Sequence, residues 1–269
     1  MPEPRNYQTE AVVIKKTKLG EADTILTFMT PSLGKTQGFG KSLRKTTSKM
    51  AGHLELLTHS TVSFAKGRNI DTITGAQTIH AFLPLKSDLW LTACGVYVAE
   101  LVNHFAAEHQ ENASLFDLLV ATLSRLSDGD DPDFVLRYFE LHLLDTAGYR
   151  PQIRECVVCH KPLEPEVNFF SPPSGGLFCP DCRSAQGFGQ EVSLNAQKVL
   201  RYLQGNDYAA ASRVRLEAAL LRDIEGLLMQ LLRYHLEREV KSAAWLDTLR
   251  DQMAQLARPP EKPSGPADG

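Results

Sequence analysis

The sequence predicts an α+β protein of several domains: an N-terminal β-barrel, a mostly α-helical central and C-terminal domain, and an inserted zinc-finger-like segment. Three observations predict this organisation. Short runs rich in β-branched and aromatic residues fill the first 82 residues, apolar residues then recur at helical spacing, and two CxxC pairs interrupt the helical region. With 269 residues, of which 43% are hydrophobic, the chain suits two or three modest globular domains.

Residues 1–82 are predicted to form five short strands. The candidate runs, separated by glycine and proline turn signals, are EAVVIKKT, DTILTFMT, LGKTQGFG, LLTHSTVSFAKG and NIDTITGAQTIHAF. In the fourth run, Val62 and Phe64 alternate with small or hydroxyl-bearing residues, as a strand buried on one face requires. Five strands with a basic segment after the third match the size and order of an OB-fold barrel. A small SH3-like barrel is the competing architecture.

Residues 83–149 are predicted to form the first part of the helical domain. Apolar residues recur at helical spacing from Leu89 to Val102, and Ser114 to Asp117 resembles a capping box at the start of the next helix. Asp131 precedes a proline, which places an N-cap before a proline at the first helical position. We expect that third helix to stop near Gly148.

After the cysteine-bearing segment, helices are expected to resume over residues 191–257. One long helix is predicted by an apolar stripe that we interpret as core, comprising Leu216, Leu220, Ile224, Leu227, Leu228, Leu231 and His235. A final helix is expected near Ala243–Leu256. The tail, residues 258–269, is polar and proline-rich and is predicted to be disordered.

The formal net charge of −3 hides an asymmetry along the chain. Residues 1–82 carry 11 lysines and arginines against 6 acidic residues, whereas the remaining residues carry 18 against 26. No acidic residue lies between Asp23 and Glu55, but five basic residues do: Lys35, Lys41, Arg44, Lys45 and Lys49. A basic block on an otherwise acidic chain favours a module that binds a polyanion. A solvated, mobile loop is the alternative interpretation.

Basic residues on a small barrel, with an aromatic residue among them, suit a groove that follows a nucleic-acid strand. Lysine and arginine neutralise phosphates, and an aromatic side chain on the barrel face can stack on a base. The candidate DNA-binding residues are Lys35, Phe39, Lys41, Arg44, Lys45, Lys49, Lys66 and Arg68.

A nucleotide-binding P-loop is a poor match to the same stretch. Gly40-Lys41-Ser42 matches the end of the motif, but Lys35 occupies the position of its first glycine. The following SLRKTTSKMAG is short, basic and rich in hydroxyls, whereas a P-loop leads directly into a long apolar-periodic helix.

Residues 150–190 contain two cysteine pairs that predict a zinc site. Cys156 and Cys159 form one CxxC, Cys179 and Cys182 form the other, and nineteen residues separate the pairs, as in structural zinc sites. Four thiolates close the coordination shell of zinc and leave no position for water, so we expect a structural ion on which the insert depends for folding. A c-type haem attachment at CVVCH and a redox CxxC are the weaker alternatives.

Other features limit the function classes. No apolar run approaches the ~20 residues that span a bilayer, and the N-terminus lacks a signal-peptide core, so we expect a cytoplasmic protein that is nucleoid-associated when bound to DNA. Disulfides are not expected, and Cys94 is interpreted as a small buried hydrophobe. No paired carboxylates, nucleophile with a base or open metal site is evident. We therefore expect no enzyme, no catalytic residue, no membrane partner and no small-molecule substrate.

The order of motifs resembles one family over roughly residues 8–235. GEADTILTFMTPSLGK comes first, followed by a basic segment ending in GHLELL and then by GRNIDTIT. A helical block ending in LRYFELHLLDTAGYRP precedes CVVCHKP…FFSPPSGGLFCPDC. These runs are similar to RecO, a family of DNA repair and recombination mediators.

The resemblance implies an OB-fold, a central helical domain and a zinc-finger-like insert. It also implies binding to single- and double-stranded DNA, annealing of complementary strands, and partnership with RecR in loading RecA onto strands coated by single-strand-binding protein. Two other functions remain open from the residues themselves. One is a zinc-stabilised OB-fold protein that binds RNA, and the other is a protein–protein adaptor whose acidic helical half binds partners.

Overall fold

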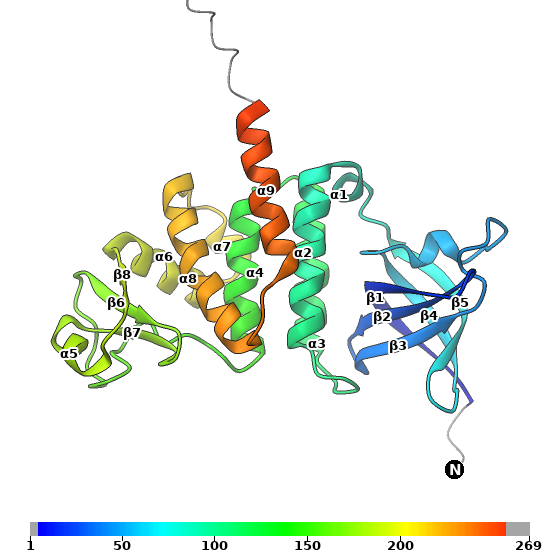
Figure 1. Cartoon of the computed structure of the whole chain (residues 1–269), viewed down its shortest axis with the longest axis horizontal. Coiled ribbons are helices and arrows are strands. Elements are labelled where there is room, and N and C mark those ends of the chain that lie inside the picture. The colour runs from blue at the N-terminus through cyan, green and yellow to red at the C-terminus, as the bar shows by residue number, and fades with distance from the viewer. Residues whose placement is uncertain (1–4, 257–269) are drawn as a thin grey trace, which may run out of the picture.

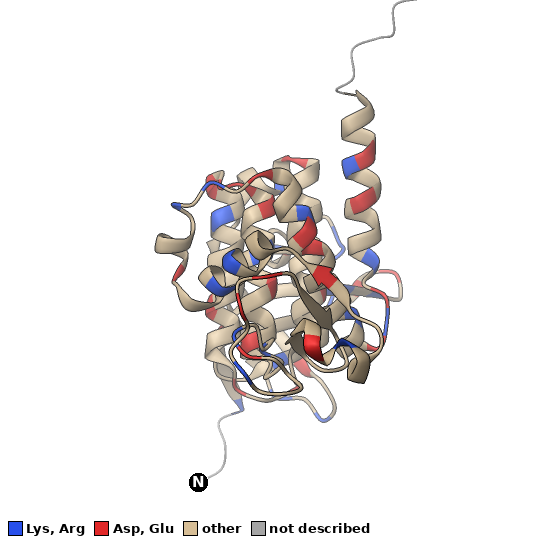
Figure 2. Cartoon of the chain, turned by 90° about the vertical axis from the view of Figure 1, so that its left-hand side faces the viewer, with Lys and Arg blue, Asp and Glu red and all other residues tan. Residues whose placement is uncertain are grey.

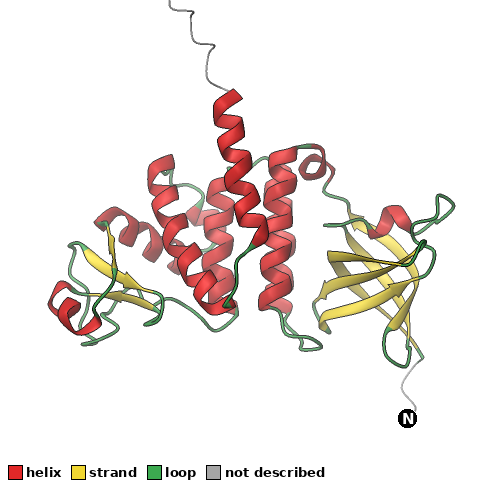
Figure 3. Ribbon diagram, viewed as in Figure 1, coloured by secondary structure: helices red, strands yellow, loops and turns green. Residues whose placement is uncertain are grey.

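The computed structural model describes residues 5–256, and the predicted disordered tail lies outside the described residues. A β-barrel occupies one end of the molecule, helices fill the middle, and a small sheet with the cysteines occupies the other end (Figures 1 and 3). The bundle of helices therefore separates the barrel, which is predicted to bind DNA, from the cysteine-bearing insert, which is predicted to bind zinc.

The barrel is closed, with strand order β1-β2-β3-β5-β4 and a parallel pairing of β3 with β5. This arrangement confirms the predicted OB-like barrel and its five strands, and the SH3-like alternative is wrong. A short 3-10 helix, η1, lies between the third and fourth strands. The elements are β1 Asn6–Leu19, β2 Asp23–Thr30, β3 Gly34–Gly40, η1 Ala51–Leu54, β4 His59–Ala65 and β5 Asp71–His80.

Alternation along the strands gives the barrel two apolar surfaces. Val13 and Phe28 point into the interior together with Val62 and Phe64, whereas Val12 and Met29 point outward and pack against the helices. A strand segment that is buried on both faces appears in sequence as the continuous apolar run AVVI. The barrel is therefore joined to the helical part by an apolar interface.

The helical part is built from α-helices that pack against α2 and α4 at its centre (Figure 1). They are α1 Leu83–Ser87, α2 Leu89–Phe105, α3 Ala113–Asp128, α4 Pro132–Thr146, α6 Leu194–Gly205, α7 Tyr208–Ala211, α8 Ala218–Leu236 and α9 Lys241–Leu256. None of the described helices is both long and apolar enough to cross a membrane.

Of the two helix caps predicted from the sequence, one is confirmed and one is wrong. The carboxylate of Asp131 caps α4 as predicted, accepting from the backbone N–H of Asp133. The predicted start of α3 at Ser114 is wrong, because Oδ1 of Asn112 accepts from the N–H of Leu115 at 3.0 Å and the helix begins at Ala113. Asparagine is as good a cap as serine, so the capping-box match alone could not decide between them.

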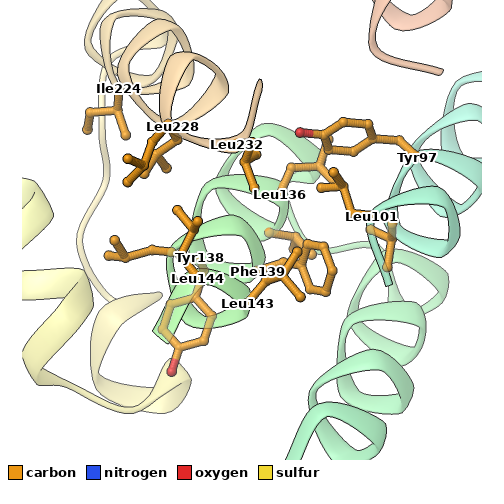
Figure 4. Close-up of a cluster of buried hydrophobic side chains, with 14 of the residues drawn as sticks. Tyr97, Leu101, Leu136, Tyr138, Phe139, Leu143, Leu144, Ile224, Leu228 and Leu232 are labelled. Atoms are coloured by element: carbon orange, nitrogen blue, oxygen red, sulfur yellow. The ribbon is translucent and has the colours of Figure 1, made fainter. Parts of the chain in front are cut away.

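The core stripe of α8 differs slightly from the predicted one. Ile224, Leu228 and Leu232 face side chains of α4 such as Leu136 (Figure 4). Leu221 is buried at the start of the stripe, whereas Leu220 is only partly buried. The predicted stripe was therefore shifted by one residue at the start of this helix.

A charged network is buried where α2, α4, α8 and α9 meet. Arg137 Nη2 lies 2.6 Å from Oε1 of Glu140, which also accepts from the hydroxyl of Tyr97 at 2.6 Å. The other arm of Arg137 contacts Glu225, which Arg250 contacts in turn. Burial alone would lower the pKa of Arg137, but the two glutamates raise it above its usual value, so the guanidinium stays charged.

We expect Arg137→Met to lower the free energy of unfolding by about 3–5 kcal/mol, because it leaves Glu140 buried without its counter-charge. Denaturant unfolding measures this. Arg222→Met, at an exposed site on α8, should change stability by less than about 0.5 kcal/mol. The double variant Arg137→Met, Glu140→Met should recover part of the loss, and a fully stable single variant would contradict the structural role of the network.

Candidate nucleic-acid interface and metal centre

The basic loop, residues 41–50, follows β3 and is fixed to the barrel at its first residues. The backbone N–H of Ser42 donates to Asp23 Oδ1 at 2.7 Å, and the N–H of Arg44 donates to the carbonyl of Ala22 at 2.9 Å. Between them, Leu43 is buried in the barrel interior. The loop is thus attached to the β1–β2 turn, which argues against the freely mobile loop considered above.

The glycine that ends β3 makes this attachment possible. A Cβ atom added to Gly40 would lie 2.0 Å from Cδ1 of Leu43, so any larger residue would displace the leucine from the barrel. The loop residues on either side of Leu43 are consequently held at the mouth of the barrel.

The cations of the basic loop point to solvent. Lys41, Arg44, Lys45 and Lys49 are all exposed, and none of them forms an ion pair within residues 5–256. Arg44 Nη1 donates to the carbonyl of Gly20 at 3.1 Å, which orients its guanidinium along the β1–β2 turn. Four unneutralised charges on a fixed loop form a positive site that a phosphate backbone would complement.

Phe39 lies on β3, and the hairpin that joins β4 and β5 lies beside the same strand. Phe39 is half-buried and pairs with Ile25 of β2 and Thr72 of β5, so its ring faces outward from the barrel. The hairpin carries the exposed Lys66 and Arg68, and it borders a hollow of about 250 Å³ beside the first half of β3. Basic groups therefore flank Phe39 at both ends of β3.

Lys35 is placed differently from the other predicted residues. Its Nζ donates to the carbonyl of Asn103 at 2.9 Å, and its backbone pairs with Ala107 and His109. It thus lies where the barrel meets the helical part, at the opposite end of β3 from the basic loop. Gly34 beside it has a φ of 61°, and its missing Cβ leaves room for the backbone of Gln110.

Sequence reasoning missed three exposed lysines on β1. They are Lys15, Lys16 and Lys18, of which Lys16 lies 3.2 Å from a carboxylate oxygen of Glu55. The signal was present as KKTK within a predicted strand. This run lies before Asp23, outside the acid-free segment that suggested the basic loop.

Among the described residues, the face at the opposite end of the molecule shows no such single-sign cluster (Figure 2). Viewed from that end, basic and acidic residues are interspersed over the helices and the small sheet (Figure 2). The barrel end is therefore the better candidate for a nucleic-acid interface.

The small sheet positions the four cysteines. Its strands are β6 Asn168–Ser171, β7 Gly176–Phe178 and β8 Gln190–Val192, with β6 in the centre. Cys156 and Cys159 lie on a turn, while Cys179 follows β7 and Cys182 ends the 3-10 helix η2, Pro180–Cys182. A short helix, α5 Arg183–Gln186, completes the insert.

The four sulfur atoms form a set that could bind a metal ion. All of them lie within 4.8 Å of one another, and Sγ of Cys159 is 3.8 Å from Sγ of Cys179. A tetrahedral ion with metal–sulfur bonds of about 2.3 Å separates its ligands by about 3.8 Å, so the geometry fits. The cluster therefore matches the spacing-based prediction of a four-cysteine site.

Backbone hydrogen bonds favour charge on one of these sulfurs, Sγ of Cys156. The N–H groups of Val158 and Cys179 each donate to Sγ of Cys156 at 3.4 Å. Burial opposes ionisation, but the backbone donors lower the pKa of the Cys156 thiol to about 6. The hydrogen bond to Cys179 raises the pKa of Cys182 to about 12. Since neighbouring thiolates repel one another, a bound cation is needed for all four to ionise together.

The fifth cysteine is unrelated to this cluster. Cys94 is fully buried in α2, as expected for a small hydrophobe. Burial raises the pKa of its thiol to about 12, so the thiolate needed for metal binding or redox chemistry is disfavoured.

The fold and the site define a class: OB-fold proteins of several parts that carry a helical bundle and a four-cysteine module able to bind a metal. Two family models match the chain, Recombination protein O N terminal over residues 3–82 and Recombination protein O C terminal over residues 86–244. The chain belongs to the RecO family of DNA repair proteins.

Curated relatives agree with this assignment. The chain is 48% identical over 250 residues to DNA repair protein RecO of Dehalococcoides mccartyi, covering 93% of this chain and 98% of that protein. It is 40% identical over 255 residues to the protein of the same name from Roseiflexus sp. strain RS-1, covering 95% and 89%. For the Symbiobacterium thermophilum protein the values are 30% over 247 residues, 91% and 98%.

Proposed function

We propose that this protein is a non-enzymatic, DNA-binding recombination mediator. It binds single- and double-stranded DNA, anneals complementary strands, and acts with RecR to load RecA onto strands coated by single-strand-binding protein. One observation carries the proposal: an OB-like barrel in a DNA repair family holds four unneutralised cations on a loop fixed to its mouth. The protein acts in the cytoplasm, at the nucleoid when it is bound to DNA.

The predicted residues make different contacts with DNA in this proposal. Lys41, Arg44, Lys45 and Lys49 contact phosphates, Phe39 stacks on a base, and Lys66 and Arg68 extend the contact along β3. Lys35 contributes from the junction with the helices. Annealing needs no covalent chemistry, because screening of phosphate repulsion with the base edges left accessible lowers the barrier to pairing.

We further propose that the metal is a structural zinc ion held by Cys156, Cys159, Cys179 and Cys182. Four soft thiolate ligands in a tetrahedral set suit zinc, and they leave no open position for a catalytic water. The ion then holds together residues 150–190, whose sheet of three short strands is small for independent stability.

An annealing assay tests the mediator role. Complementary strands are first coated with single-strand-binding protein, and pairing is then followed with and without this chain. We expect the chain to accelerate annealing by about tenfold or more, because the barrel screens phosphate repulsion. Equal rates with and without the chain would contradict the proposal.

Competition between single-stranded DNA and RNA of one sequence separates the repair function from RNA binding. The adaptor function predicts that loss of the basic loop leaves DNA affinity unchanged. Each alternative therefore has its own distinguishing result.

A further inference from the structure

A cleft of about 530 Å³ lies between the second half of β1, helix α2 and the segment that leads into α9. Buried and half-buried apolar residues form its floor, namely Ile14, Leu56, Val96 and Ala99. Exposed cations form its rim, namely Lys15, Lys16, Arg238 and Lys241. The rim therefore brings together charges that are more than 200 residues apart in the sequence.

The acidic residues of the cleft already have partners. Glu100 accepts from the backbone N–H groups of Lys241 and Ser242, at 3.2 and 2.8 Å, and from the hydroxyl of Ser242. Glu239 lies 3.2 Å from Nε of Arg233. Within residues 5–256, no ion pair is formed by three rim cations: Lys15, Arg238 and Lys241. With Glu239 paired to Arg233 and Lys16 to Glu55, these three cations outnumber the single carboxylate of Glu100, so the cleft carries a net positive charge.

A β-bulge builds this rim. The register of β1 against β2 shifts between Val13 and Lys15, which places Ile14 and Lys15 next to each other on the outer face. Ile14 is buried against the helices, and Lys15 is left at the edge of that contact. On the other side, the capping of α9 by Glu100 fixes the backbone that carries Lys241.

The cleft lies beside the proposed DNA-binding face. Thr17, Ile25 and Phe39 form one cross-strand row on the outer face of β1, β2 and β3. Lys15 lies two residues before Thr17 on the same face, about 7 Å from that row. The uncharged side chains of Thr17 and Ile25 therefore separate the cations of the cleft from Phe39 and the basic loop.

We propose that the cleft binds the phosphate backbone of a second nucleic-acid strand while the basic loop holds the first. The inference rests on the proposed DNA-binding function. Two strands that must pair repel each other through their phosphates, and two separate cationic tracks on one chain neutralise both backbones at once. The apolar floor takes the sugar edge, and the rim cations contact the phosphates.

Binding stoichiometry tests this directly. Oligonucleotides of about 8 nucleotides, comparable to the site size of one OB fold, are titrated into the full chain at low salt. We expect two oligonucleotides per wild-type chain, and one per chain for the cleft variant Lys15→Glu, Arg238→Glu, Lys241→Glu. The loop variant Lys41→Glu, Arg44→Glu, Lys45→Glu should also bind one. The matched control reverses three exposed arginines elsewhere on the helical part, Arg213→Glu, Arg215→Glu and Arg222→Glu, and should bind two.

Annealing rates give a second measurement. The cleft variant should anneal complementary strands about tenfold more slowly or worse, while its affinity for one short oligonucleotide stays within about twofold of wild type. One oligonucleotide per wild-type chain, or two on the cleft variant, would overturn the inference. Loss of an acidic protein partner by a cleft variant that still binds two oligonucleotides would assign the cleft to that partner instead. No binding by any of the proteins would contradict the proposed function itself.

Discussion

Reversal of the three charges at Lys41, Arg44 and Lys45 is expected to weaken the affinity for single-stranded DNA by about 100-fold at about 0.1 M salt. A logarithmic slope near −0.7 per neutralised phosphate corresponds to about fivefold in affinity for each contact, and three contacts multiply. These side chains are exposed and form no ion pair within the described chain, so their loss removes phosphate contacts without unfolding the barrel.

The salt dependence identifies the cause of that loss. If the three cations neutralise phosphates, the slope of log affinity against log salt falls in magnitude by about 2 in the variant. Fluorescence anisotropy over a range of salt concentrations measures both quantities. The arginine control on the helical part carries the same change in net charge and should leave both within about twofold of wild type. Unchanged affinity in the loop variant would favour the adaptor function.

The barrel was predictable because its strands carry local signals of their own. Alternation of Val62 and Phe64 with polar neighbours, together with glycine and proline turns, marks strands that are buried on one face. The insertion of the basic segment after the third strand then favours an OB-fold but leaves an SH3-like barrel open. The closed topology, with β3 pairing in parallel with β5, confirms the OB-like barrel.

The surroundings of individual charges were not predictable in the same way. Lys35 belongs to the basic block in sequence, but its partner Asn103 lies 68 residues away. The cleft cations Lys15 and Arg238 likewise become neighbours only through the packing of the barrel against α2 and α9. Charge composition therefore indicates one end of the molecule as the candidate interface, whereas the path of a bound strand depends on tertiary contacts.

The cysteine cluster was predictable because the ligands of a metal site repeat at fixed spacing. Two CxxC turns separated by a short sheet bring four sulfur atoms together almost regardless of the intervening sequence. The hydrogen bonds that favour charge on Cys156 come from the backbone of Val158 and Cys179, and no residue type in the sequence signals them.

Replacement of Cys156 by serine is expected to remove the metal and unfold residues 150–190. Metal binding contributes on the order of 10 kcal/mol in such sites, far more than a sheet of three short strands can supply. Limited proteolysis should then cut within the insert, and metal analysis of the purified protein should show the loss of zinc. Cys94→Ala is the matched control, because that thiol is buried in α2 and is not part of the cluster.

DNA affinity should survive the same substitution. The cysteines and the barrel lie at opposite ends of the molecule with the helical bundle between them (Figure 1), so the basic loop should bind DNA within about twofold of wild type. Proportional loss of zinc and of DNA affinity, in a protein whose barrel remains folded, would instead place a DNA contact on the insert. Full metal content in Cys156→Ser would show that the other three thiolates suffice. Zinc content and DNA affinity, both measured on Cys156→Ser, therefore test whether the barrel binds DNA while the metal site has a structural role.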